Sequence, residues 1–459
     1  MMQFPEDFRA QYAALYGEAD FEAFTSSFEE EVPVSIRVNP LKWPHRVPLE
    51  PVPWASNAFL LAQRPLFACD PLWHSGAYYV QDASSMFLEH LFNELPLEAE
   101  HPVVLDLCGA PGGKATHLAA LLGKKGGLLV ANESIASRAA ILAENLRKWG
   151  SPDVLVTNND PAALGKLEGL FDVIVADVPC SGEGLFRKNP AAMSQWSLSH
   201  VALCAARQQR IIADVWPALK PGGFLIYSTC TFNALENEEN LRWISRTYEA
   251  EPVAISVDQA WNLVPSRVAE ISGWHFFPHR VPGEGFFIAA FRKSTGKRWR
   301  PPRKSTLRTM SPLPKGVLDG TTLFTAPLVL TEWKGKAMAI NPRWLTLTDY
   351  LHSHLKVSHT GVAVGSISGR GWVAGHDLYL SPLLARDYLE PYALKEDEVL
   401  RFLAKEHFMP SGLVKGERYL ATYRGVNMGG FKYLGNRVNT SFPTEWRLRN
   451  RCKALARIL

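Results

Sequence analysis

The sequence predicts a doubly wound α/β fold for residues 96–293, because short apolar runs alternate there with longer stretches of helical periodicity. Two helix patterns carry recognisable ends: Ser134 is expected to cap a helix at 138–149 that Gly150 closes, and a helix at 198–219 is closed by Pro221 and two glycines. The apolar runs have the length of buried parallel strands and lie at 103–107, 128–131, 154–157, 173–176 and 224–228, with a last strand expected at 285–291.

The rest of the chain divides around this region. Residues 1–95 predict an accessory domain with amphipathic helices and a strand at 34–39. Residues 294–317 are rich in basic residues and proline and lack periodicity, which indicates a linker. Residues 318–459 carry alternating β patterns, for example at 337–341 and 417–423, followed by a basic end. This combination favours a mostly β module that binds nucleic acid.

Composition narrows the class of protein. The 459 residues are 47% hydrophobic with a formal net charge of +4, so any basic surface must be local. The six cysteines lie far apart without a CxxC pair, which fits neither a disulfide framework nor a zinc ribbon. The sequence shows no signal-peptide pattern and no run of about 18 apolar residues. We therefore expect a soluble, cytoplasmic monomer with no metal and no membrane partner.

A glycine-rich loop follows the first predicted strand and opens a helix, where backbone N–H groups approach a ligand closely. It lacks the G-x-G-x-x-G spacing of dinucleotide folds, and its lysine is not followed by Ser or Thr as in a phosphate loop. Glu133 ends the second strand, where a carboxylate can accept both hydroxyls of a ribose. Loop and acid together predict S-adenosylmethionine as the cofactor. The loop residues are Cys108, Gly109, Ala110, Pro111, Gly112, Gly113 and Lys114.

Two further acids follow strands of the same predicted sheet. Asp160, after the third strand, is expected beside the adenine and its ribose. Asp177, after the fourth strand, is expected at the boundary between cofactor and substrate. The alternative interpretation makes these acids helix caps, and it stays open for Asp160 because Pro161 follows it.

Two cysteines end different strands: Cys180 in Asp-Val-Pro-Cys-Ser-Gly and Cys230 in Ser-Thr-Cys-Thr. A thiolate that adds to C6 of a cytosine makes C5 nucleophilic enough to take a methyl group from a sulfonium. This chemistry needs a cysteine beside the base, a group at ring N3 and a path for the C5 proton, and Cys230, Asp177 and Cys180 could supply these roles. The alternative role, a buried small hydrophobe, is the interpretation preferred for Cys69, Cys204 and Cys452.

At these residues the chain resembles the Nol/Nop/Sun family of RNA cytosine-5 methyltransferases. Two cysteine motifs in this order are specific, since DNA cytosine methyltransferases use a single Pro-Cys cysteine. The resemblance extends to 37–39, 79–86 and 283–287. It implies a Rossmann-like S-adenosylmethionine-dependent methyltransferase sheet, with Cys230 as the nucleophile that bonds to C6 and Cys180 as the residue that helps to release the product.

The same resemblance implies the remaining site residues. Lys114 and Asp177 are expected to face the active site. Cofactor contacts are expected from residues 108–114, Glu133, Asp160 and Asp177, and Arg138 is expected to reach the same region because it lies just over one helical turn after Glu133.

Residues 182–188 and the long C-terminal extension resemble the bacterial branch of this family, which modifies 16S ribosomal RNA. The branch pattern implies an accessory RNA-binding domain at 1–95, a small domain at 318–394 and a PUA-like RNA-binding domain at 395–459. The expected partner is ribosomal RNA or the small ribosomal subunit. Two alternatives stay open, namely the same chemistry on transfer RNA and an inactive RNA-binding assembly factor; the intact motifs argue against the second.

Contacts to RNA are predicted from basic side chains. Arg187 and Lys188 are expected to pair with phosphates near the target base. The base must be unstacked, and Phe186 and Trp196 are candidates to stack on it, although aromatics more often pack in a core. The linker cations and the basic end would track the backbone farther away; that end contains Lys432, Arg437, Arg447, Arg449, Arg451, Lys453 and Arg457.

Overall fold

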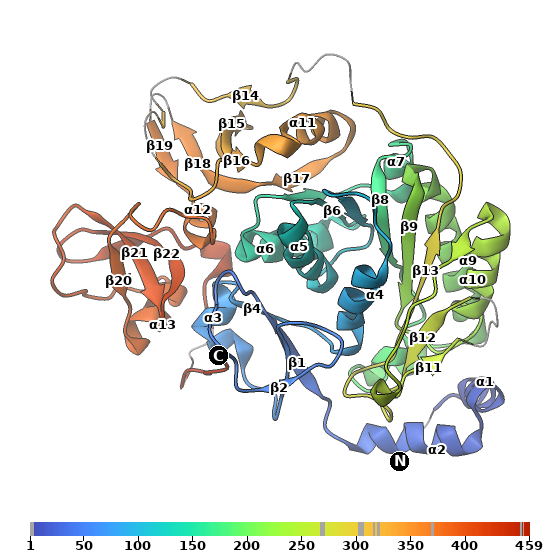
Figure 1. Cartoon of the computed structure of the whole chain (residues 1–459). Helices are drawn as coiled ribbons and strands as arrows, with labels where there is room; N and C mark the ends of the chain where they lie inside the picture. Colours follow the sequence, from blue (N-terminus) through green and yellow to red (C-terminus); the bar gives the residue numbers. More distant parts are fainter. Residues whose placement is uncertain are drawn as a thin grey trace.

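Figure 1 shows the chain as a computed structural model in which, over the described residues, three smaller β-sheets are arranged around one large central sheet. The structure describes residues 4–266, 271–301, 307–314, 317–318, 322–368, 371–449, 452 and 454–459.

The central sheet has the strand order β11-β12-β13-β9-β8-β5-β6-β7-β17, with β10 paired to β13. Strands β5 to β9 are parallel, whereas β13 and β17 are antiparallel to their neighbours. The order reverses between β5 and β8, and the crevice at the carboxyl ends of such strands is where α/β sheets bind ligands. The bounds are β5 (Val103–Asp106), β6 (Leu128–Asn132), β7 (Val154–Thr157), β8 (Phe171–Asp177), β9 (Leu219–Thr229), β10 (Glu251–Pro252), β11 (Val264–Pro265), β12 (Gly273–Phe276), β13 (Phe286–Arg292) and β17 (Val357–Thr360).

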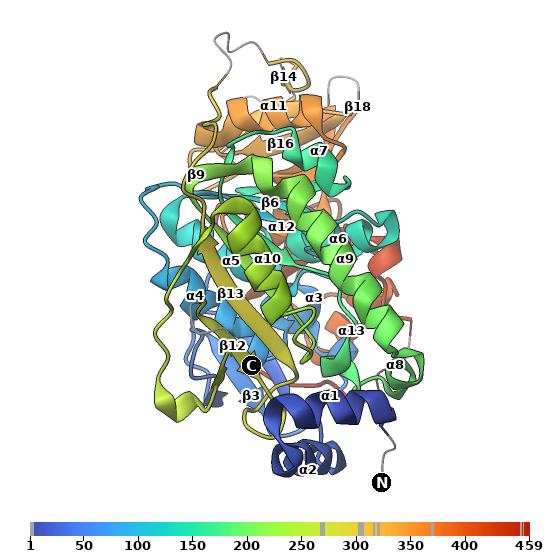
Figure 2. The ribbon, with the colours of Figure 1, turned by 90° about the vertical axis from the view of Figure 1, so that its right-hand side faces the viewer.

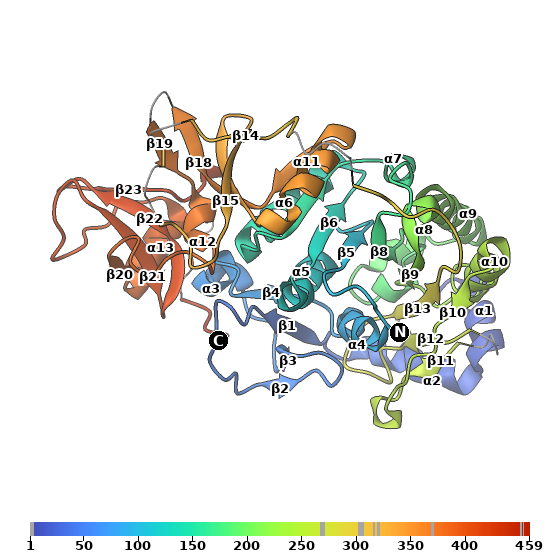
Figure 3. The same cartoon turned by 45° about the horizontal axis from the view of Figure 1, so that its top comes forward.

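Helices cover both faces of this sheet, as Figures 2 and 3 show from two directions. Val104 of β5 packs into the core on one face and Leu105 into the core on the other, because successive strand residues point to opposite sides. The first face carries α4 (Leu88–Glu94), α5 (Gly113–Lys125) and α6 (Ala136–Trp149); the second carries α7 (Pro161–Gly165), α9 (Leu198–Val215), α10 (Glu238–Tyr248) and α11 (Leu345–His354).

The N-terminal region contributes a helical hairpin and a small antiparallel sheet. The hairpin shares an aromatic core with Phe186 and Phe232, which follow the two cysteine motifs. Arg37 is buried in the sheet and donates to Gln81 Oε1 (3.0 Å) and to Thr116 Oγ1 of α5 (2.6 Å), so the sheet is joined to the catalytic region. The elements are α1 (Glu6–Tyr16), α2 (Glu18–Ser26), β1 (Val34–Val38), β2 (Glu50–Pro51), β3 (Ala58–Leu61), α3 (Pro71–His74) and β4 (Tyr78–Val80).

Two further sheets form the C-terminal region, on the left and at the top of Figure 1. The second of these sheets, which contains β20 to β23, shares a core with the N-terminal sheet, because Phe402 and Met428 pack in the same cluster as Ile36 and Tyr78. The first contains β14 (Ser311–Pro312), β15 (Val329–Trp333), β16 (Lys336–Ile340), β18 (Val362–Ser368) and β19 (Gly371–Ala374), and α12 (His376–Leu380) follows it; the second contains β20 (Pro391–Ala393), β21 (Arg418–Tyr423), β22 (Val426–Tyr433) and β23 (Val438–Thr440), with α13 (Glu396–Ala404).

The predicted strands of the catalytic region are all present, but two helix ends differ from the prediction. The N-cap of α6 is Ile135 rather than Ser134, and the backbone N–H of Ile135 donates to Glu133 Oε1 at 3.0 Å. A carboxylate therefore already supplies the acceptor that Ser134 was predicted to provide. Helix α9 ends at Val215 because Pro217 has no N–H to continue it, and β9 begins at Leu219, before the predicted closing turn.

Three long-range features were not expected. Cys69 and Cys452 form a disulfide, so the prediction that these cysteines are unpaired was wrong. The C-terminal tail runs along the N-terminal domain there, with the N–H of Ala456 donating to Cys69 O (3.1 Å).

Strand β17, from the region predicted as a small separate domain, extends the central sheet. Part of the predicted linker forms β14, and Trp299 packs against Tyr350 of α11.

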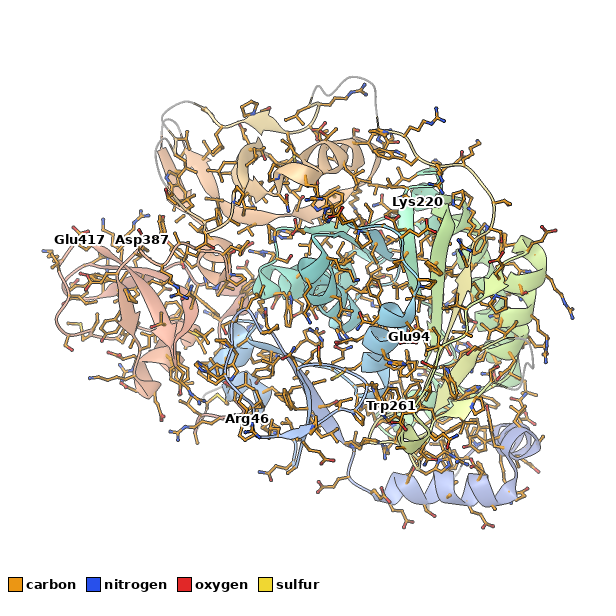
Figure 4. The ribbon with its side chains drawn as sticks, in the orientation of Figure 1. Arg46, Glu94, Lys220, Trp261, Asp387 and Glu417 are labelled. Atoms are coloured by element: carbon orange, nitrogen blue, oxygen red, sulfur yellow. A yellow bond between two sulfur atoms is a disulfide. The ribbon has the colours of Figure 1, made fainter. Side chains whose placement is uncertain are left out.

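Figure 4 shows side chains filling the space between these layers. Trp261 stacks edge-on against Phe87 and His90 beside α4, and Glu94 of α4 accepts a hydrogen bond from Ser256 (2.9 Å). Lys220, labelled at the opposite end of the molecule from the helical hairpin, marks the amino end of β9. The Cys230 motif lies at the other end of the same strand, and the Cys180 motif follows the neighbouring strand β8.

Candidate active site

The two cysteines of the sequence motifs meet at the carboxyl ends of neighbouring parallel strands. Asp177 of β8 is in register with Ser228 of β9, so the loops that follow both strands start side by side. The Sγ atoms of Cys180 and Cys230 are 3.1 Å apart, and the N–H of Cys230 points at Cys180 Sγ (3.3 Å). Both cysteines are half-buried.

The contact makes the two thiols chemically unequal. The hydrogen bond with Cys230 and burial together raise the pKa of Cys180 well above its ordinary value. A thiol that keeps its proton is a hydrogen-bond donor, and a neighbouring sulfur that accepts this bond is stabilised as the thiolate. In this arrangement Cys180 can donate its S–H to the sulfur of Cys230.

An ion pair lies beside the thiols. Lys114 Nζ is 2.9 Å from Asp177 Oδ2, and Ser228 donates to Asp177 Oδ1 at 2.8 Å. The ammonium also lies 4.9 Å from the ring centroid of Phe286. Burial by itself would lower the pKa of Lys114, but the charge and hydrogen bond of Asp177 outweigh it and raise this pKa. Lys114 thus stays a cation, and the pair offers a donor and an acceptor at one place.

The glycine loop joins β5 to α5, as the motif predicts, and its backbone contacts residues of β6 and α6. Three of its backbone groups are fixed: the N–H of Gly109 donates to Asn132 O (2.8 Å), Ala110 O accepts from Arg138 (3.0 Å) and Pro111 O accepts from Asn145 (2.8 Å). Gly112 has φ +125°, a conformation that favours glycine. Gly113 begins α5, which carries Lys114 in its first turn. Burial raises the pKa of Cys108, so this thiol stays neutral.

Glu133 lies at the end of β6 with one oxygen available for a ligand. Its Oε1 accepts from the N–H of Ile135, whereas its buried Oε2 accepts no hydrogen bond from the described residues and lies 3.6 Å from Arg138. A free, buried acceptor at this position suits a ribose hydroxyl of the predicted cofactor.

Asp106 is a site residue that the sequence prediction missed. It is fully buried at the end of β5, and within the described part of the chain neither of its oxygens accepts a hydrogen bond. Burial, and then repulsion from Asp177, raise the pKa of Asp106 to about 7 although Lys114 opposes this. The available signal was its place as the last strand residue before the glycine loop. Two unpartnered oxygens beneath this loop suit the donors of a bound ligand.

The Asp160 side chain lies at the start of α7. Its side chain caps α7, because Oδ1 accepts from the N–H of Ala162 at 3.0 Å. The helix-cap interpretation is therefore confirmed, and a role in cofactor binding stays a prediction.

Arg187 is buried and paired within the protein, so the prediction that it pairs with phosphate was wrong. The guanidinium is buried against Glu284 (3.0 Å) and donates to Ser27 O (3.1 Å), so its charge is already matched. Lys188 is 35% exposed beside Asp82 (3.2 Å) and keeps a face open to solvent. Phe186 and Trp196 pack in the aromatic core with the helical hairpin rather than on a ligand.

The C-terminal cations lie on the surface. Lys432, Arg437, Arg447, Arg449 and Arg457 are exposed, whereas Arg451 and Lys453 lie outside the described residues, as do Arg303 and Lys304 of the predicted linker. Over the described ranges, no helix is both long and apolar enough to cross a bilayer, and no group of three or more His, Cys, Asp or Glu side chains could hold a metal.

Comparison with known proteins decides the family. Residues 95–292 match the family described as 16S rRNA methyltransferase RsmB/F. Residues 4–83 match the N-terminal domain of 16S rRNA methyltransferase RsmF, and residues 390–448 match the methyltransferase RsmF PUA domain. Ribosomal RNA small subunit methyltransferase F of Enterobacter sp. (strain 638) is 30% identical over 96% of this chain and 95% of its own length. The chain belongs to the RsmF family of 16S rRNA methyltransferases.

Other relatives agree with the RsmF assignment. The enzyme of the same description from Pectobacterium atrosepticum is 31% identical over 92% of this chain and 91% of its own length. A crystal structure of a methyltransferase homolog protein from Pyrococcus horikoshii is 27% identical, with a TM-score of 0.54, and covers 64% of this chain and 96% of that one. The predicted Rossmann-like methyltransferase sheet and PUA domain are confirmed, and dependence on S-adenosylmethionine follows from the RsmF family. The PUA match begins at residue 390, ahead of the predicted boundary at 395.

Proposed function

We propose that this RsmF-family enzyme methylates C5 of a cytosine in 16S ribosomal RNA through a transient covalent bond between Cys230 and C6 of the base. The observation that supports this proposal most directly is the pair of thiols 3.1 Å apart at the carboxyl ends of β8 and β9. A buried structural cysteine needs no second thiol and no adjacent ion pair, whereas addition to a pyrimidine ring uses both.

Residues around the glycine loop fit S-adenosylmethionine, which supplies an electrophilic methyl group on its sulfonium. Glu133 Oε2 would accept a ribose hydroxyl, and the free oxygens of Asp106 would accept N–H groups of the amino-acid part. Loop residues 108–114 would approach through their backbone, with Arg138 holding the loop from outside. Asp160 would lie beside the nucleoside while it caps α7.

The two cysteines would act in sequence. The Cys230 thiolate forms a bond to C6, which places an electron pair at C5, and this carbon takes the methyl group as the methyl–sulfur bond breaks. The C5 proton then passes to water, the C5–C6 double bond re-forms and the C6–sulfur bond breaks. Cys230 leaves as a thiolate that accepts a hydrogen bond from Cys180, so the S–H of Cys180 promotes release.

The ion pair would hold the ring during these steps. Lys114, which remains protonated, can donate to the N3 and O2 edge of the base as negative charge develops there. Asp177 can accept from the exocyclic amine, and Ser228 keeps its carboxylate oriented. A cytosine presents this donor and acceptor pattern only when it is unpaired, so the target base must leave any duplex.

Replacing each cysteine separately tests the proposal. Cys230→Ala should abolish methyl transfer and form no adduct, whereas Cys180→Ala should attack and methylate yet remain attached to RNA through denaturation. Cys204→Ala is the matched control, since Cys204 is buried in α9 and contacts His200. Denaturing gels with labelled 16S RNA report the adduct, and mass spectrometry reports 5-methylcytidine. Equal slowing by Cys230→Ala and Cys180→Ala would reject the division of labour.

The same trapped species identifies the RNA. We propose that the enzyme works as a monomer in the cytoplasm, on ribosomal RNA or on the small subunit. Sequencing RNA attached to Cys180→Ala in cells should recover 16S fragments. Recovery of transfer RNA would reject the assignment to 16S RNA, and failure of the unmodified enzyme to methylate small subunits, naked 16S RNA or transfer RNA would favour an assembly factor without turnover.

A further inference from the structure

Each of the two loops that carry the thiols has a glutamate whose carboxylate accepts backbone hydrogen bonds from the other loop. Glu236, on the Cys230 loop, accepts the backbone N–H of Ser181, the residue directly after Cys180, at 3.0 Å. Glu183, on the Cys180 loop, accepts the backbone N–H groups of Phe232 and Asn233 at 2.7 and 3.0 Å. Each loop therefore holds the backbone of the other beside the reactive cysteine.

Asn233 joins the two carboxylates at the centre. Its Nδ2 lies 2.8 Å from Glu183 Oε1 and 2.8 Å from Glu236 Oε1, and its Oδ1 accepts the N–H of Glu236 at 2.9 Å. Two nearby contacts tighten the arrangement: the hydroxyls of Ser181 and Thr231 are 3.0 Å apart, and Gln208 donates to Glu236 Oε2 at 2.6 Å. We call Glu183, Asn233 and Glu236 the crossed clamp.

The clamp is costly to bury, which argues for a role beyond packing. Glu183 is 1% exposed and Glu236 is fully buried. The donors that the described residues supply to both are neutral N–H and O–H groups, so hydrogen bonds fix their positions without a cation to cancel their charge. Burial raises the pKa of Glu236 against these hydrogen bonds. Buried charges of this kind are retained where they serve a site rather than stability.

The geometry points to Glu236 and Glu183 as positioning residues that set the distance between the two thiols and so decide how readily the RNA adduct is resolved. This inference rests on the proposed cysteine adduct. Of the two thiols, attack on the base requires only Cys230, whereas release also requires Cys180 within hydrogen-bonding distance of the departing sulfur. Loosening the clamp should therefore slow release more than attack.

Glu236→Gln is the sharpest test because it keeps the volume of the side chain. The new amide group can be placed in two orientations, and each brings its N–H groups against another donor. In one orientation they face the N–H groups of Ser181 and Gln208, and in the other they face the amide of Asn233. A misplacement of about 1 Å can slow an enzyme on the order of 100-fold, so we expect kcat to fall on the order of ten- to a hundredfold. The KM for S-adenosylmethionine should stay unchanged, and the covalent adduct should accumulate.

The readout is the ratio of adduct to released product at steady state, which counts only active molecules and does not change when part of the protein is unfolded. Glu183→Gln, which loosens the same clamp from the other loop, should raise this ratio as well. The double variant Cys180→Ala with Glu236→Gln should accumulate no more adduct than Cys180→Ala, since both changes act on one step. The matched control is Glu89→Gln, a buried acid bonded to His117 between α4 and α5, and it should leave the ratio unchanged.

The outcomes separate this inference from the proposed function. Adduct from Cys180→Ala together with an unchanged ratio in both clamp variants would overturn the positioning role and leave the cysteine mechanism intact. Loss of activity with no rise in adduct in either clamp variant would overturn it too. Absence of adduct from Cys180→Ala would overturn the cysteine mechanism and this inference with it.

Discussion

The two ends of strands β8 and β9 carry the same kind of ion pair in opposite settings. At the amino ends, Lys220 Nζ lies 2.7 Å from Asp172 Oδ1, and Asp172 Oδ2 accepts the N–H of Val103 at 2.8 Å. At the carboxyl ends, Lys114 Nζ lies 2.9 Å from Asp177 Oδ2 beside the two thiols. The first pair is satisfied by neighbouring strands alone. The second pair keeps an open side towards the crevice where α/β sheets bind their ligands.

Asp106 makes the contrast stronger. Both Asp106 and Asp172 are buried acids of central strands, yet both oxygens of Asp172 have partners, whereas those of Asp106 have none among the residues that the structure describes. An unpartnered buried carboxyl destabilises a fold and is tolerated where a ligand supplies the missing donors. One end of the sheet is thus arranged for stability and the other for binding.

The largest expected effect is at the catalytic pair. Asp177→Asn keeps the shape of the side chain but removes the charge that Lys114 faces and the acceptor proposed for the base. We expect kcat to fall on the order of 10²- to 10³-fold, in the range of lost acid–base or electrostatic catalysis. The free energy of unfolding should also fall, by roughly 1–3 kcal/mol, because Lys114 is only 14% exposed and loses the anion that stabilises its charge. Methylation rates and urea unfolding of the same preparation measure both quantities; a rate loss matched by the loss of folded protein would contradict this prediction.

The second effect is at Asp106 and depends on pH. Because its folded-state pKa is raised from 3.8 to about 7, the folded protein favours the protonated carboxyl. The stability that this group contributes is fully present below about pH 4 and is lost as the pH rises through 7. Asp106→Asn has no charge to bury, so it should be more stable than the unmodified protein by roughly 1–3 kcal/mol at pH 8. The difference should vanish towards pH 4.

Urea unfolding at several pH values measures this difference, and cofactor titration by calorimetry measures its cost in function. Asp106→Asn should bind S-adenosylmethionine more weakly while it unfolds less readily, a trade-off typical of site residues. A stability gain that is the same at pH 4 and pH 8 would show that the charge of Asp106 is not the cause.

The comparison also explains which features could be predicted from sequence. Buried parallel strands have a characteristic length and composition, so their positions were predictable, and the residues that follow them were predictable as site residues because carboxyl ends meet at one edge. Cys180, Cys230, Lys114 and Asp177 all came together on that basis. Asp106 was missed because a motif shows residue types and does not show whether a carboxyl finds a donor.

Local sequence patterns could not predict the contacts between distant segments of the chain. The disulfide joins Cys69 to Cys452 across 383 residues, and no spacing rule connects them. Arg187 follows a glycine-rich turn, which suggested phosphate binding. Its partner Glu284 lies 97 residues later in the sequence. Strand β17 joins the sheet by pairing with β7, although the paired residues Val357 and Thr157 are 200 positions apart in the sequence. Such pairings depend on tertiary packing, which local periodicity does not encode.

The smallest effect is expected at the amino ends of the strands, and it is the direct counterpart of the first. Asp172→Asn removes the partner of Lys220 and weakens the acceptor for the N–H of Val103, while it leaves the crevice untouched. Lys220 is partly exposed and can turn to water, so the free energy of unfolding should fall by about 1–2 kcal/mol rather than by the larger cost of a fully buried pair. Because the change lies at the far end of β8 from Asp177, kcat per folded molecule and the KM for S-adenosylmethionine should equal those of the unmodified enzyme. Asp172→Asn and Asp177→Asn make the same chemical change on one strand, so a fall in kcat for Asp172→Asn comparable to that of Asp177→Asn would show that the two ends are coupled rather than separate.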